Sequence, residues 1–149
     1  MGDRTWVEIV VLNTTLPLVE EILPDDAEIS TSLEPSSFYF HEVNNGCIEE
    51  QGQLTEMGIP YNYEWGSGDN YKSGFKYIRF TPEGDPQHIE YYEDEINPPL
   101  EKLLELVSKP KELAEYVQKY SDDITPLPWD NQVEYGKIYR TRRLILANT

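Results

Sequence analysis

The chain has 149 residues, of which 28 are acidic and 12 basic, so its formal net charge is −16. This length favours one domain spanning residues 1–149, and an apolar content of 38% excludes a disordered acidic tail. No apolar run approaches the roughly 20 residues that cross a bilayer, so no membrane partner is expected. The negative charge argues against direct binding of nucleic acid and favours a basic protein partner.

Acidic and basic residues are distributed unevenly along the chain. Residues 1–135 hold all 28 acids and eight of the 12 bases, whereas the last 14 residues hold Lys137, Arg140, Arg142 and Arg143 without any acid. We expect this basic cluster to pair with acids of the fold or of a second subunit, because the surrounding negative field repels DNA. A homodimer is compatible with that expectation.

The first half of the chain reads as strands with two short helices. The stretch TWVEIVVLN (5–13) has apolar side chains on both faces, a pattern typical of a central strand that is covered on both sides. Alternation of apolar and polar residues predicts further strands within 27–33, 36–43 and 59–65. Short helices are predicted within 14–23 and 47–58, the second ended by Gly58.

A glycine-rich loop, GSGDNYKSG (66–74), precedes two strands within 75–95 that a Pro/Gly turn joins. The stretch QHIEYYEDEI (87–96) is therefore predicted to be a strand that ends in an acidic corner. Leucine spacing then predicts helices within 98–109 and 110–120. Segment 129–146 is predicted as a terminal helix, with a final strand over 137–146 as the alternative because Gly136 weakens a helix.

Strands first and helices later predict an α+β fold, in which an antiparallel sheet is covered by helices. Five stretches within residues 37–146 carry a resemblance: HEVNNG, MGIPYNYEWGSGDNY, YIRFTPEG, INPPLEKLLEL and PWDNQVEYGKIYRTRRL. Together they resemble small acidic proteins carried on plasmids and prophages, and this resemblance includes no catalytic motif. Such an origin implies a counter-defence role. In charge, though not in motif, the chain is similar to DNA-mimic antirestriction and anti-CRISPR proteins.

The chain contains two histidines, His41 and His88. If their strands pair, the two rings and Glu90 would approach one another, and two His with a carboxylate can hold a catalytic metal. A metal-dependent hydrolase using His41 and His88 is therefore one alternative. Glu42 would not join it, because adjacent residues on a strand point to opposite faces. The other interpretation is that both histidines are structural, and no cofactor or metal is expected.

Other catalytic chemistry finds little support. Cys47 cannot form an internal disulfide, which is consistent with a reducing, cytoplasmic location, and Glu49 and Glu50 oppose its thiolate. The loop 66–74 lacks the helix and lysine spacing of a phosphate cradle. Carboxylates beside Tyr and Trp would suit a sugar subsite, but such neighbours arise by chance in so acidic a chain. We therefore favour a binding protein over an enzyme.

The acidic stretches themselves are the remaining candidate site. Alternate residues on a strand lie about 6.6 Å apart, and residues i and i+4 of a helix lie about 6 Å apart, a spacing of the same order as that of neighbouring phosphates. Rows of carboxylates could thus replace DNA in a basic groove of a host protein. The alternatives are a solvated acidic face on an ordinary protein, or an acidic structural or interaction protein that does not mimic DNA. The candidate partner-binding residues are Glu90, Tyr91, Tyr92, Glu93, Asp94, Glu95, Glu101, Glu105, Glu112 and Glu115.

Overall fold

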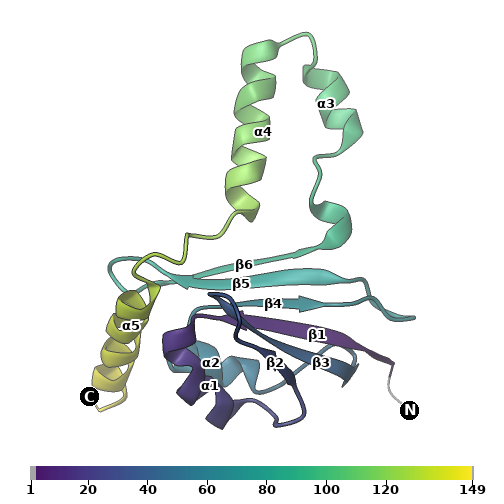
Figure 1. Cartoon of the computed structure of the whole chain (residues 1–149). Helices are drawn as coiled ribbons and strands as arrows, with labels where there is room; N and C mark the ends of the chain where they lie inside the picture. The colour runs from purple at the N-terminus through teal and green to yellow at the C-terminus, as the bar shows by residue number, and fades with distance from the viewer. Residues whose placement is uncertain (1–2, 149) are drawn as a thin grey trace.

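The computed structural model describes residues 3–148 and has the predicted α+β architecture (Figure 1). Six antiparallel strands form one sheet in the order β2-β3-β1-β4-β5-β6, so the N-terminal strand lies near the middle. The strands are β1 (Arg4–Val11), β2 (Glu28–Ser30), β3 (Ser36–Asn44), β4 (Tyr61–Trp65), β5 (Gly74–Phe80) and β6 (Pro86–Tyr92).

Helices and 3-10 turns occupy the connections. Each predicted helix is present, and the segment for which a strand was the alternative is a continuous helix. Within residues 3–148, every helix is too short or too polar to span a bilayer. The helical elements are η1 (Asn13–Thr15), α1 (Leu16–Ile22), α2 (Gln51–Glu56), η2 (Glu93–Glu95), α3 (Leu100–Leu106), α4 (Pro110–Ile124) and α5 (Gln132–Ala147).

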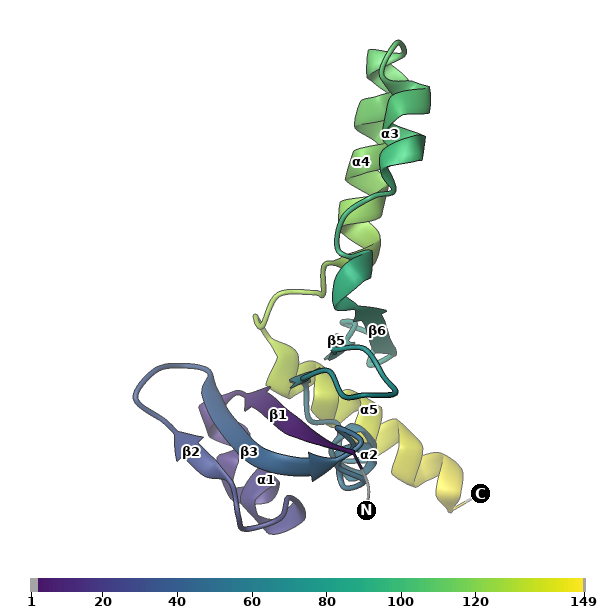
Figure 2. The same ribbon diagram turned by 90° about the vertical axis from the view of Figure 1, so that its right-hand side faces the viewer.

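The hydrophobic core lies on one face of the sheet. The alternation in β1 points Val7, Ile9 and Val11 to this face, where all three are fully buried. Helices α1 and α2 cover it with Val19 and Leu54, which are also fully buried. Helix α5 completes the layer through Tyr135 and Tyr139, and Figure 2 shows the three helices on the same side of the twisted sheet.

The opposite face of the sheet departs from the prediction. The apolar residues on both sides of β1 predicted a strand covered on both faces, and this is wrong, because Trp6, Glu8 and Val10 remain partly exposed. The physical reason is that α1, α2 and α5 all pack on the core side (Figure 2). We call the second side of the sheet the open face. Its central residues are Trp6, Glu8, Tyr39, Glu64, Phe75, Tyr77 and Tyr91.

Helices α3 and α4 do not cover the sheet. They pack against each other as a hairpin that stands up from the β6 edge (Figure 1). The Tyr120 hydroxyl of α4 donates to the carbonyl of Glu95, which fastens the base of the hairpin to η2. Leu106 of α3 is buried, whereas Leu104 of the same helix is 62% exposed.

Candidate functional site: an acidic corner and an open sheet face

The side chains of the acidic stretch at the end of β6 point to both faces of the strand. Glu90 lies opposite Lys76 of β5 on the core side but is exposed, and its carboxylate contacts the ring of His88 at 3.1 Å. Tyr91 points to the open face and stacks on Phe75 with 5.4 Å between ring centroids. The strand thus runs into an acidic corner, as predicted, but its charges do not form one row.

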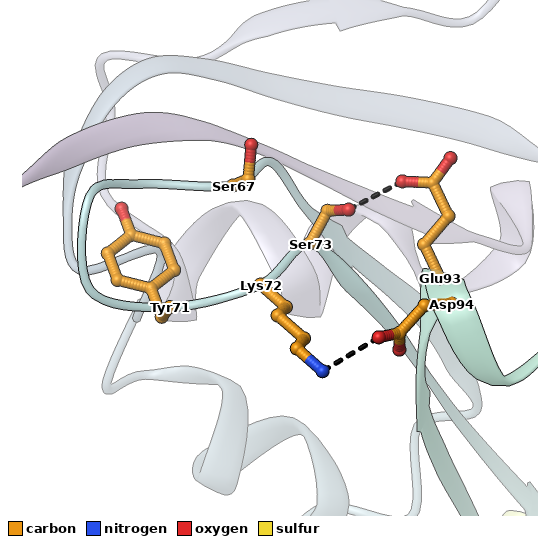
Figure 3. Close-up of a pocket in the computed structure, with 6 residues that line it drawn as sticks. All are labelled: Ser67, Tyr71, Lys72, Ser73, Glu93 and Asp94. Atoms are coloured by element: carbon orange, nitrogen blue, oxygen red, sulfur yellow. Dashed lines mark hydrogen bonds and ion pairs between the residues drawn. The ribbon is translucent and has the colours of Figure 1, made fainter.

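The corner itself is built by η2 and the glycine-rich loop. Glu93 accepts a hydrogen bond from the Ser73 hydroxyl, and Asp94 forms an ion pair of 2.7 Å with Lys72 (Figure 3). This contact with Asp94 raises the pKa of Lys72 and keeps its ammonium charged. These side chains, with Ser67 and Tyr71, line an open hollow of about 420 Å³. The stretch 87–96 contains no Lys or Arg, and the glycine-rich loop supplies Lys72.

The helical rows belong to a separate part of the molecule. Glu101 and Glu105 lie on α3, while Glu112 and Glu115 lie on α4, and all four are exposed. Lysines interrupt both rows, since Lys102 contacts Glu105 at 3.7 Å and Lys109 contacts Glu112 at 3.9 Å. The candidate residues therefore fall into two groups, the corner and the hairpin, which are joined at the base of α4.

The structure does not bring the two histidines together. His41 is on β3 and His88 on β6, with β1, β4 and β5 between them. Four strand spacings of about 4.8 Å separate them by roughly 19 Å, which is too far for one metal ion. Each ring instead contacts a neighbouring carboxylate, Glu28 at 2.9 Å and Glu90 at 3.1 Å. A shared metal site for His41 and His88 is therefore wrong, because their strands do not pair.

Two of the four basic residues in the C-terminal cluster pair with acids of the fold, as expected from the sequence. Arg142 of α5 contacts Asp85 in the β5–β6 turn at 3.1 Å, and Arg143 contacts Glu56 at the end of α2 at 3.6 Å. Both contacts join α5 to the ends of other elements. The pairing is established for these two arginines.

The open face also holds residues that are not among the candidates predicted from the sequence. Glu8 of β1 lies directly opposite Glu64 of β4, and Tyr39 and Phe75 lie beside them on the flanking strands. Desolvation, followed by the charges of Glu8 and Glu93, raises the pKa of Glu64. Strand alternation places each residue on a face, but the pairing of Glu8 with Glu64 requires the strand order. A carboxylate pair on an aromatic surface suits a cation.

Comparison with protein-family models, with curated proteins and with solved structures finds no match to this chain. The resemblance to plasmid and prophage proteins accordingly stays a prediction.

Proposed function

We propose that the protein binds a basic protein surface that otherwise contacts nucleic acid, and so acts as an inhibitor by DNA mimicry. The observation that carries the proposal is the excess of uncompensated carboxylates. Only eight of the 28 acidic residues form ion pairs among residues 3–148, and two of the eight have a histidine as partner. A groove that releases counterions on binding DNA would accept such a surface.

The acidic corner is the proposed centre of this interface. It combines exposed Glu93, Asp94 and Glu95 with Tyr92, a rigid aromatic side chain that is 45% exposed. Aromatic residues are frequent anchors of protein interfaces, and the surrounding charge would accelerate association with a basic partner. The hairpin is a weaker candidate, because lysines lie between its carboxylates. We also propose that the protein acts in the cytoplasm and that a mobile genetic element encodes it.

The test compares two variants with the same change in net charge. The corner variant carries Lys at Glu90, Glu93, Asp94 and Glu95, and the control carries Lys at Glu20, Glu21, Asp25 and Asp26, which are exposed on and after α1. Each protein is used to capture partners from a host lysate at low salt, after thermal melting has confirmed its fold. The proposal predicts that the wild type and the control capture a basic DNA-binding protein, that the corner variant does not, and that duplex DNA releases it.

Two results would contradict the proposal. Equal loss in both variants would show that net charge alone attracts the partner, without a site at the corner. Capture that duplex DNA leaves unchanged would show that the bound surface is not the one that contacts nucleic acid.

A further inference from the structure

The open face presents one continuous row of side chains across five strands. In register, Tyr39 of β3 lies opposite Glu8 of β1, Glu8 opposite Glu64 of β4, Glu64 opposite Phe75 of β5, and Phe75 opposite Tyr91 of β6. Directly opposed side chains have Cβ atoms about 4.5–5.5 Å apart. Two neighbouring carboxylates are thus bracketed on both sides by aromatic rings.

The rings form two groups at the borders of this row. Trp6 stacks on Tyr39 with 6.0 Å between centroids and 13° between planes. On the other side, the Phe75 ring stacks on Tyr91, and the hydroxyls of Tyr77 and Tyr91 are 3.3 Å apart. All of these residues are partly exposed. The faces of the aromatic rings carry partial negative charge, so the whole row attracts cations.

The carboxylate pair lacks a cation of its own. Like charges directly opposite each other on a sheet are destabilising, and neither Glu8 nor Glu64 forms an ion pair among residues 3–148. Glu8 accepts one hydrogen bond of 2.9 Å from the Ser37 hydroxyl. A cation from outside the fold would neutralise both carboxylates at once.

The same face already holds one guanidinium at its far end. Arg79 is on the β5 face that carries Phe75 and Tyr77, and it is buried under the segment between α4 and α5. Its guanidinium lies 3.7 Å from the centroid of the Trp129 ring and donates to Asn62 and to the carbonyl of Leu127. This face of the sheet therefore already holds a guanidinium that combines an aromatic ring with oxygen acceptors.

We infer that the open face binds an arginine side chain of a basic protein segment, with Glu8 and Glu64 accepting its hydrogen bonds and the rings of Tyr39 and Phe75 on either side. The planar guanidinium has five donors, which suit two carboxylates and stack on aromatic rings. The inference depends on the proposed function in one respect only: the arginine belongs to a basic partner. The Glu8–Glu64 pair is separate from the acidic corner.

The test uses the whole protein and a short capped peptide of alternating Arg and Ser, followed by side-chain NMR. We expect the peptide to shift the resonances of the Trp6 indole and of the Tyr39 and Tyr91 rings. The double variant Glu8→Gln/Glu64→Gln should bind the peptide roughly tenfold more weakly or worse, because both charged acceptors are gone. The matched control Glu20→Gln/Glu21→Gln changes the net charge equally on exposed α1 and should bind like the wild type.

Three results would overturn the inference: a peptide that leaves the aromatic resonances unchanged, a double variant with undiminished affinity, or a Lys–Ser peptide that binds as tightly as the Arg–Ser peptide. The last would show that the guanidinium is not recognised. Specific peptide binding without capture of any basic protein would support this inference and count against the proposed function. Capture of a basic partner by the wild type, together with an Arg–Ser peptide that fails to bind, would do the reverse.

Discussion

Glu64 lies where three unfavourable influences meet. Its carboxylate is partly removed from water and faces the charges of Glu8 and Glu93, and these effects raise its pKa. The folded protein therefore binds the proton of this group more tightly than the unfolded chain does. Its favourable contribution to folding is complete below the unfolded pKa of about 4.3 and is lost as the pH rises through the folded pKa.

The substitution Glu64→Gln should accordingly stabilise the protein at neutral pH. Removing one of two opposed like charges is expected to increase the free energy of unfolding by about 0.2–1 kcal/mol. The gain should shrink as the pH falls toward 4, because the wild-type carboxyl is then protonated. Thermal denaturation at the two pH values measures the difference, with Glu20→Gln as an exposed control on α1. A gain that is the same at both pH values would contradict the electrostatic explanation.

Helix α5 meets the rest of the molecule at a glycine contact. The backbones of Gly136 in α5 and Gly58 after α2 are so close that a Cβ atom on Gly136 would overlap the carbonyl oxygen of Gly58. Gly58 also has a φ of +71°, which favours glycine at the end of a helix. The buried Gln132 side chain bonds both backbone groups of Phe80 and fixes the start of α5 beside β5.

The substitution Gly136→Ala should destabilise the protein although alanine is the better helix former. Two backbones would have to separate, and overpacking of this kind costs roughly 1–3 kcal/mol or more. The control Gly52→Ala in α2 adds a Cβ that meets nothing within 4 Å, and it should be neutral or stabilising by up to about 1 kcal/mol. Chemical denaturation measures both. A stable Gly136→Ala variant would show that α5 can shift without loss.

Gly136 also shows which features could be predicted from the sequence and which could not. Local periodicity was sufficient for the strands and helices, since it depends on neighbours that the printed sequence displays. The same glycine weakened the helix prediction for 129–146, because a close contact with residue 58 has no local signal. The order of the six strands is equally non-local, and it separates His41 from His88 and brings Glu8 beside Glu64.

The candidate site could likewise be predicted only where it depends on local sequence. The run of acids at 90–95 is visible as composition, and the corner forms where the sequence predicted it. Whether those acids stay unpaired depends on loops, because Lys72 and Ser73 reach them from the preceding turn. Glu8 and Glu64 of the open face were not among the candidates, because they are distant in sequence and neither lies in a charged run.

At the scale of the whole molecule, the excess of negative charge affects stability. Most of its carboxylates have no cationic partner among residues 3–148, while the ion pairs that exist join side chains that are at least 42% exposed. Exposed pairs contribute only about 0–1 kcal/mol each. Repulsion within a protein of net charge −16 acts over every uncompensated acid, so it should outweigh the attraction of these few pairs.

Added sodium chloride should therefore raise the melting temperature of the free protein. Between about 0.01 M and 1 M salt the screening length falls from about 30 Å to about 3 Å, which removes long-range repulsion before it removes contacts of 3–4 Å. The variant with Lys at Glu20, Glu21, Asp25 and Asp26 has a smaller net charge and should show a smaller rise. Chloride is preferred to sulfate, because sulfate also strengthens apolar burial. A melting temperature that falls with salt would mean that the exposed ion pairs contribute more to stability than the repulsion removes. The negative surface would then not destabilise the fold.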